Sequence, residues 1–129
     1  MDKNQVLKPF GYPFPKSARL LTKSQFQSVL RAGKRFIGSG VSIDWRKGFV
    51  SKPKLGITVS KRYGKAHDRN RFKRLVREIF RAASPTMSQD LEINVIPRRS
   101  GVLCSKEVLE ADFKRFLLQI ENRQNPNGP

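Results

Sequence analysis

One stretch of the chain concentrates side chains that can bind phosphate. Between residues 61 and 81, nine Lys and Arg residues are accompanied by two acidic ones, Asp68 and Glu78. The arginine fork binds phosphate oxygens in pairs and stacks on bases, and lysine neutralises phosphate as a compact charge. A solvated helix face usually mixes charges of both signs, which this stretch does not. We therefore interpret it as a nucleic-acid-binding element, with a solvated polar face as the alternative.

The distribution of charge over the whole chain supports this interpretation. The 129 residues carry a formal net charge of +17. Residues 1–81 hold 21 Lys and Arg against 4 Asp and Glu, whereas residues 82–129 hold 6 of each. A polyanion is the expected partner of such a surface. An acidic lipid surface is a poorer candidate, because binding there usually also needs a free apolar helix face or a lipid anchor.

The side chains that would let the protein itself cut RNA are scarce. An acid–base mechanism needs two positioned titratable groups, and His67 is the single histidine. A two-metal site needs several converging carboxylates. The basic part of the chain offers four, without clustered spacing: Asp2, Asp44, Asp68 and Glu78. We therefore expect a binding protein without catalytic residues or a metal site of its own.

Cysteine content and hydropathy bear on the compartment. The single cysteine, Cys104, excludes an internal disulfide and favours a reducing environment. No N-terminal apolar run resembles a signal peptide, and no apolar stretch approaches the roughly 18 residues that a membrane span requires. We expect a cytoplasmic protein with no membrane partner.

Composition divides the chain into three parts. Residues 1–18 alternate Pro and Gly with aromatic residues and are expected to form an extended arm. A single domain is expected over 19–121, followed by a disordered polar tail over 122–129.

Apolar periodicity predicts the elements of that domain. Thr22 and Gln25 form a capping box for a short helix that Gly33 ends. Alternating residues predict strands over 41–45, 55–59 and 91–95, and an additional strand begins at Phe36. A last helix is expected to open at Ser105 as its cap and to bury the stripe Leu109, Phe113, Phe116, Leu117 and Ile120.

The basic stretch itself is predicted to lie on an amphipathic helix. Asp68 is placed to cap a helix that begins near Arg69, and the turn Tyr63-Gly64-Lys65 before it adds a flexible basic approach with an aromatic ring. The basic side chains project away from an apolar stripe that must face the sheet. This stripe is Phe72, Leu75, Val76, Ile79, Phe80 and Ala83.

Two blocks of this region carry a resemblance to a known family. They are LGITVSKRYGKA at residues 55–66 and RNRFKRLVREIFR at residues 69–81. Together they resemble the signature of the bacterial ribonuclease P protein family, including its Arg-Asn-Arg helix. The likeness continues more loosely outside the blocks, and covers about residues 16–121.

The resemblance implies a fold and a function. The fold is an α/β (α+β) two-layer sandwich, with a small mixed sheet, three helices and a left-handed βαβ crossover, like the second domain of ribosomal protein S5. The function is that of the RNA-binding protein subunit of a ribonucleoprotein. In this role the protein binds the catalytic ribonuclease P RNA in a one-to-one complex, and assists it in removing the 5′ leader from precursor tRNA. Catalysis is implied to lie with the RNA, which is also expected to bind most of the Mg²⁺.

The resemblance also implies two sets of site residues. By motif, the residues that bind the catalytic RNA are Lys61, Arg62, Lys65, Arg69, Asn70, Arg71, Lys73, Arg74 and Arg77. A central cleft between the first helix and the sheet is implied to contact the precursor tRNA leader, through Phe26, Leu30 and Phe36. To these we add the polar sheet residues Ser42, Asp44, Thr58 and Ser60.

Three alternatives stay open on the sequence alone. The chain has the composition of a basic ribosomal or RNA-chaperone protein with no role in cleavage. Phe26 has the periodicity of a core residue as well as of a cleft residue. His67 stands where the family usually has an aliphatic residue, which leaves the local packing and a pH dependence open.

Overall fold

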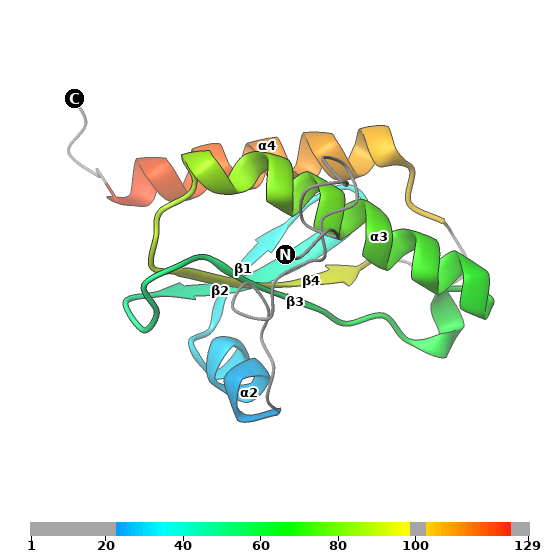
Figure 1. Cartoon of the computed structure of the whole chain (residues 1–129), viewed down its shortest axis with the longest axis horizontal. Helices are drawn as coiled ribbons and strands as arrows, with labels where there is room; N and C mark the ends of the chain where they lie inside the picture. Colours follow the sequence, from blue (N-terminus) through cyan, green and yellow to red (C-terminus); the bar gives the residue numbers. More distant parts are fainter. Residues whose placement is uncertain (1–22, 99–102, 125–129) are drawn as a thin grey trace, which may run out of the picture.

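The computed structural model describes residues 23–98 and 103–124. Figure 1 shows a four-stranded sheet with helices on both of its faces. The helices are α2 (Lys23–Arg31), α3 (Ala66–Ala83) and α4 (Lys106–Gln124). The strands are β1 (Lys34–Ile37), β2 (Val41–Lys47), β3 (Lys54–Ile57) and β4 (Leu91–Pro97). Two short 3-10 helices, η2 (Lys61–Tyr63) and η3 (Ser84–Thr86), flank α3.

The sheet is mixed, with the strand order β1-β2-β4-β3. The pairs β1/β2 and β2/β4 are antiparallel, whereas β3 and β4 are parallel neighbours joined through α3. A parallel pair needs such a crossover, because a tight hairpin cannot join strands that run the same way. The three helices and the mixed sheet confirm the expected fold class; the handedness of the crossover stays a prediction.

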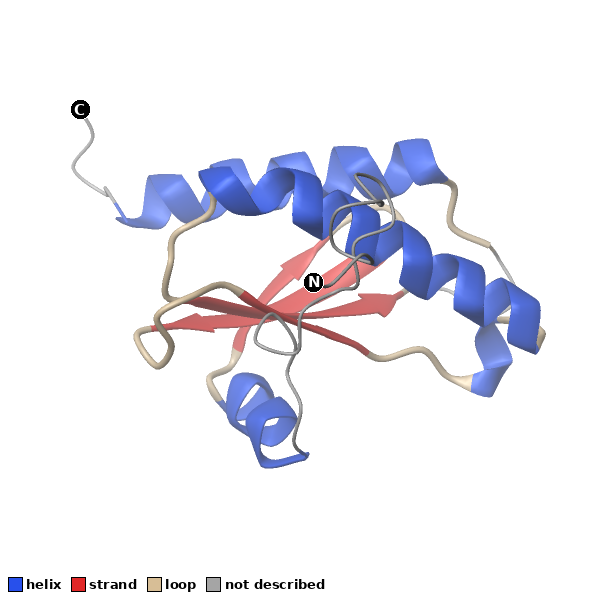
Figure 2. Ribbon diagram, viewed as in Figure 1, coloured by secondary structure: helices blue, strands red, loops and turns tan. Residues whose placement is uncertain are grey.

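One face of the sheet forms the hydrophobic core with α3 and α4, which lie together on that side (Figure 2). Each strand turns alternate residues toward it, as period-two patterning predicts. The apolar stripes predicted for α3 and α4 are confirmed. All their members are buried except Ala83 and Leu117, which pack partly buried against the cluster. The core therefore holds α3 with its basic side outward.

The opposite face of the sheet carries α2 and is not simply solvated (Figure 1). Val29 of α2 is fully buried. Beside it, polar side chains that alternation would place in water are also buried, and three of them bind other side chains: Asp44 binds Arg35, Glu92 binds Arg46, and Asn94 accepts a hydrogen bond from Thr58. These buried polar residues are Ser42, Asp44, Glu92 and Asn94. The two-layer description holds for the sheet with α3 and α4, and the short α2 adds cover on the second face.

Local capping is partly as the sequence predicts. The Ser105 Oγ accepts a hydrogen bond from the Val108 N–H at 3.2 Å and caps α4. Gly33 follows α2 with a φ of +73°, which favours glycine. The prediction for Asp68 is wrong in position, because α3 begins three residues earlier than expected, at Ala66. Asp68 sits in the first turn, where its carboxylate accepts the N–H of Lys65, the residue before the helix, at 3.1 Å.

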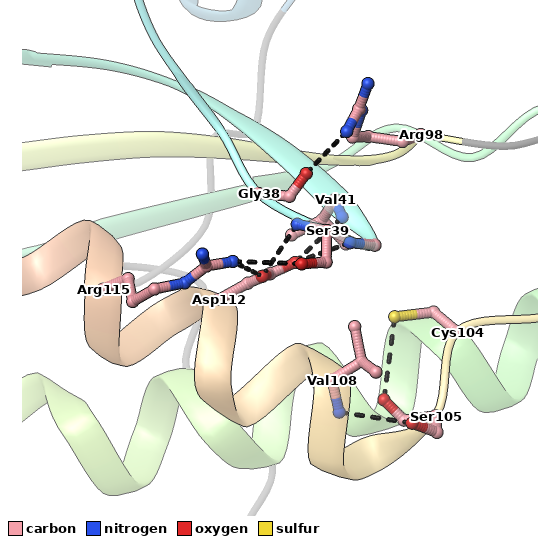
Figure 3. Close-up of polar contacts among 10 residues, drawn as sticks. Gly38, Ser39, Val41, Arg98, Cys104, Ser105, Val108, Asp112 and Arg115 are labelled. Carbon is pink, nitrogen blue, oxygen red and sulfur yellow. Dashed lines mark hydrogen bonds and ion pairs between the residues drawn. The ribbon is translucent and has the colours of Figure 1, made fainter.

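Asp112 of α4 clamps the turn between β1 and β2 (Figure 3). Its buried carboxylate accepts the backbone N–H groups of Ser39, Gly40 and Val41 at 2.8–3.1 Å, and an Arg115 N–H at 2.6 Å. A Cβ added at Gly38 would collide with this carboxylate. Close approach of the backbone therefore explains the glycine at that position.

Several expectations fall on other parts of the chain. The arm over 1–18 and the cap Thr22 lie outside the described residues, as does the tail beyond residue 124. Helix α4 continues to Gln124, past the domain end expected at residue 121. None of the helices in the described ranges combines the length and the apolar character of a membrane span.

Candidate nucleic-acid interface

The basic surface of α3 is built by the burial of its opposite side. Phe72, Leu75, Val76, Ile79 and Phe80 are buried, so the helix cannot turn about its axis. The remaining predicted residues consequently point outward. Asn70, Arg71 and Arg74 are exposed, and Arg69, Lys73 and Arg77 are partly exposed along the edges of the same surface. We call these six residues the α3 band.

The segment before α3 extends this surface and is anchored by Tyr63. The Tyr63 ring is buried against Phe72, with 5.2 Å between ring centroids, and its hydroxyl accepts the Cys104 N–H at 2.8 Å. The ring is therefore part of the core and is not available to stack on RNA. Its burial also raises the pKa of the hydroxyl. The anchored turn leaves Lys61, Arg62 and Lys65 exposed in series with the band: the three complete the nine predicted RNA-binding residues.

Six basic residues of this surface have no carboxylate beside them among the described residues. Within those ranges, Arg35, Arg46 and Arg115 form ion pairs, and the His67 imidazole lies 3.4 Å from the Asp68 carboxylate. No carboxylate lies within ion-pair distance of Lys61, Arg62, Lys65, Arg71, Lys73 or Arg74 in those ranges. Like charges on neighbouring turns repel, so an anionic partner that neutralises them is favoured.

Neighbouring polar groups orient parts of the surface. The Arg69 guanidinium donates to the Gly64 carbonyl at 2.8 Å, which holds it against the turn. His67 has a side chain that is 79% exposed, with its Nε2 3.4 Å from the nearer Asp68 oxygen. The histidine is thus a surface residue beside the band and takes no part in the core.

A second surface, which is concave, lies on the other face of the sheet, under α2. It is a groove of about 370 Å³ between that helix and three of the strands. Its wall is α2, with the half-buried ring of Phe26 and the exposed Leu30. The complete lining is Phe26, Gln27, Leu30, Arg35, Asp44, Thr58, Asn94 and Ile96.

The floor of the groove is a polar network in fixed geometry. Arg35 binds Asp44 through two bonds, Nε to Oδ1 at 2.6 Å and Nη2 to Oδ2 at 3.0 Å. The Arg35 side chain is 46% exposed and that of Asp44 only 5%. The hydrogen bond that Arg35 donates to Asp44 raises the pKa of Arg35, so the guanidinium stays charged. Beside the pair, Thr58 donates to the Asn94 side chain at 3.2 Å.

The structure brings together only part of the predicted cleft. Phe26, Leu30, Asp44 and Thr58 line the groove. Phe36 does not, because it is 5% exposed on the core face, with its ring centroid 5.7 Å from that of Phe116. Two further predicted residues are absent from the lining: Ser42 is buried in β2, and Ser60 is exposed in the loop before η2.

Sequence reasoning missed Arg35, Asn94 and the flanking Gln27 and Ile96. The strand register supplies the missing signal, since Arg35 stands opposite Asp44, which stands opposite Asn94. Residues opposite one another in paired strands share a sheet face. Once Asp44 is placed on the groove face, its cross-strand partners follow.

Neither a metal site nor a reactive thiol is found among the described residues. Within the described ranges, no group of three or more His, Cys, Asp or Glu side chains is placed to hold a metal ion. Cys104 is buried beneath the start of α4, and burial raises the pKa of its thiol to about 11. Since the thiolate is the reactive form, this cysteine is a packing residue.

The fold and these two surfaces define a small α/β RNA-binding protein, with a cationic helix face and a separate groove under α2. Comparison with known proteins makes the class specific. The profile of the family described as Ribonuclease P matches residues 14–121. The chain belongs to the Ribonuclease P protein family.

Relatives and solved structures agree with this assignment. The Ribonuclease P protein component of Desulfosudis oleivorans is 39% identical over 119 residues, which cover 92% of this chain and 95% of that protein. That of Dictyoglomus turgidum is 41% identical over 113 residues, covering 84% and 90%. The solved RNase P protein from Thermotoga maritima aligns with a TM-score of 0.67 and 29% identity, over 77% of this chain and 94% of that one.

Proposed function

We propose that this chain is the RNA-binding subunit of the ribonuclease P ribonucleoprotein, and that it assists the catalytic RNA in removing the 5′ leader from precursor tRNA. The observation that carries the proposal is the separation of two surfaces by the sheet. The α3 band lies on one side, and the groove under α2 lies on the other. A protein so built can hold two anionic strands at once.

The α3 band suits the larger partner, the catalytic RNA. Arg71, Lys73 and Arg74 have no carboxylate within ion-pair distance among the described residues, so they can neutralise phosphates and release bound counterions, which strengthens binding without requiring a particular sequence. Lys61, Arg62 and Lys65 extend the contact beyond the helix. The apolar side of α3 fixes the orientation in which the RNA docks.

The groove suits the leader, which is single-stranded. Phe26 offers a ring, and Leu30 an apolar surface, on which unpaired bases can pack. The exposed edge of the Arg35 guanidinium can donate to a phosphate or to a base edge. Asp44 keeps that guanidinium in place and cancels its excess charge. In this arrangement Asp44 positions Arg35 and does not itself touch the leader.

We assign cleavage to the RNA and place the Mg²⁺ mainly on its phosphates. The imidazole and carboxyl groups beside the band are His67 and Asp68, which lie 3.4 Å apart, and the exposed Glu78 of α3. The contribution of the protein is then electrostatic. It screens the repulsion between catalytic RNA and leader, so that the complex needs less Mg²⁺. A one-to-one cytoplasmic complex completes the proposal.

The test is cleavage of precursor tRNA by the catalytic RNA at low Mg²⁺, with and without the purified protein. We expect stimulation by the wild-type chain and weaker stimulation by Arg71→Ala/Arg74→Ala. Lys114→Ala, which removes one exposed charge from α4, is the matched control and should stimulate as the wild type does. Retained RNA binding without any stimulation would overturn the proposal in favour of a ribosomal or chaperone role.

A further inference from the structure

An aromatic side chain outside the groove takes no part in the core of the described residues. Phe49 lies in the connection between β2 and β3 and is 68% exposed. The chain turns just before it at Gly48, whose φ is +98° and whose N–H bonds the Asp90 carbonyl at 3.2 Å. A phenyl ring projecting into water from an ordered turn contributes nothing to the core. It is therefore a candidate contact for a partner.

One side of the Phe49 ring is already occupied by a cation. The Arg46 guanidinium carbon lies 4.0 Å from the ring centroid. Arg46 is itself held by Glu92, with Nε 2.6 Å from Oε1, and Glu92 is fully buried. The ring is thus fixed on a braced guanidinium, while most of its surface faces solvent. A rigid aromatic surface of this kind loses little conformational entropy when a flat group stacks on it.

The position of the ring relates it to the groove. Side chains alternate along β2, so Arg46 projects from the same sheet face as Asp44 in the groove floor. Phe49 therefore lies beyond the end of the floor, no more than about 17 Å along the chain from Asp44. A single-stranded RNA that leaves the groove along β2 would contact Arg46 first and then Phe49.

The charge around the ring favours an anionic strand. Residues 46–55 contain four basic residues and no acidic one. Lys52 is exposed in the same turn, whereas the Lys47 Nζ is buried and does not face the ring's surroundings. The nearest acid on the adjoining loop, Asp90, accepts a hydrogen bond from Ser88 at 2.7 Å. An aromatic ring set among cations is the usual arrangement for holding an unpaired nucleotide.

We propose that Phe49, braced by Arg46, is a stacking site for a base of single-stranded RNA, namely the part of the 5′ leader upstream of the nucleotides in the groove. The site rests on the proposed function, because it needs the leader to occupy the groove first. It extends the leader contact from the α2 groove to the end of the sheet where β2 and β3 join.

The experiment measures the affinity of the reconstituted ribonucleoprotein for precursor tRNAs whose leaders are shortened stepwise from the 5′ end. With long leaders, Phe49→Ala is expected to bind about fivefold more weakly or worse than the wild type, because it loses the stacking of one base on the ring. Below the length that reaches Phe49, the two proteins should bind equally. Phe49→Trp should restore the affinity for long leaders, and Phe49→Leu, which keeps apolar bulk without a ring, should not.

The outcomes separate this proposal from the function on which it rests. If the wild-type protein shows leader-dependent affinity and Phe49→Ala matches it at every length, only the stacking site is overturned. If Phe49→Ala weakens binding equally at all lengths, the ring contacts another RNA and the proposal is wrong. Absence of leader dependence in the wild type would instead remove the proposed function. Since the ring is exposed, thermal unfolding of the variants should match that of the wild type.

Discussion

The arginines of α3 and those of the sheet differ in their partners. Arg71 and Arg74 have no carboxylate within ion-pair distance among the described residues, whereas Arg35 and Arg46 each bind a buried carboxylate at 2.6 Å. Unpaired arginines retain their full charge for a polyanion, and their contribution weakens as salt rises. Paired arginines add little net charge, but their partners hold the guanidinium groups in one orientation. The arginines of α3 are therefore suited to attracting RNA, and those of the sheet to orienting it.

This difference predicts distinct responses to mutation. Removing Arg71 or Arg74, which are exposed on α3, takes away charge without disturbing the fold. Removing a partner from a sheet pair leaves a charge in a partly desolvated place and so disturbs the fold or the groove.

The largest effect is expected for Glu92→Ala. It leaves the Arg46 guanidinium without its buried partner and should lower the free energy of unfolding by about 3–5 kcal/mol. Urea denaturation of the free protein measures the loss. Arg74→Ala serves as the contrast and should change stability by less than about 0.5 kcal/mol. Equal stability of the two variants would remove the distinction between the two groups of arginines.

Asp112 extends the comparison to a third paired arginine, Arg115. Burial opposes ionisation of the carboxyl, but hydrogen bonds from Gly40, Ser39, Arg115 and Val41 lower its pKa below the ordinary 3.8. The resulting stabilisation is present above that ordinary value and is lost as the pH falls through the folded-state pKa. Asp112→Asn should cost about 1–3 kcal/mol at neutral pH. In this variant the free energy of unfolding should also decrease less steeply as the pH is lowered into the acid range, as measured by unfolding over a pH series. An unchanged pH dependence would contradict this role.

In the groove, Arg35→Ala should weaken leader binding about tenfold, because it removes a donor and exposes the Asp44 carboxylate to RNA. The informative variant is Arg35→Ala/Asp44→Asn, which removes the charge on both sides. Affinity for a long-leader precursor should partly return in the double variant. If it does not, repulsion from Asp44 plays no part.

Phe26→Ala tests the apolar wall of the same groove. Leader affinity should fall about fivefold, with no change in affinity for the catalytic RNA. The two affinities are measured separately by titration. If the variant unfolds instead, Phe26 is a core residue and the groove is defined by its floor alone.

The smallest effect is expected for Arg74→Ala on the α3 band. Affinity for the catalytic RNA should fall modestly, and the slope of log affinity against log salt should decrease in magnitude by somewhat less than one. Lys114→Ala on α4 provides the same loss of charge elsewhere and should leave the slope unchanged. An unchanged slope for Arg74→Ala would mean that this arginine contacts no phosphate.

The fold was predictable where the apolar periodicity within a single helix or strand determines which side is buried. The helical period of α3 places Phe72 and Arg74 on opposite sides without knowledge of the rest of the chain. Alternation likewise identified the apolar residues that β2 and β4 bury in the core, but not the polar residues buried on their other face. The start of α3 was less predictable, because an acid is favoured both as the cap before a helix and as the third residue within it. In the structure Asp68 is the third residue and accepts the N–H of Lys65, the residue before the helix.

The groove was less predictable because it depends on register between strands. Phe36 and Arg35 are neighbours in β1, and a shift of one residue exchanges the faces they occupy. Arg35 faces Asp44, and Asn94 joins them from a strand some fifty residues further along the chain. Short-range patterns therefore predict that this sheet face is polar, but they do not identify Arg35 as part of the groove floor.

The Asp112 clamp has a consequence for how the molecule is made. The backbone groups that it binds lie 71 to 73 residues earlier in the chain, so every strand and the whole of α3 are synthesised before the clamp can close. Closing so long a loop carries an entropic cost that is repaid only when α4 docks. A chain still emerging from the ribosome therefore carries its complete cationic segment while one wall of its core is missing. The basic residues of α3 are therefore synthesised before α4 docks and fixes the fold that orients them.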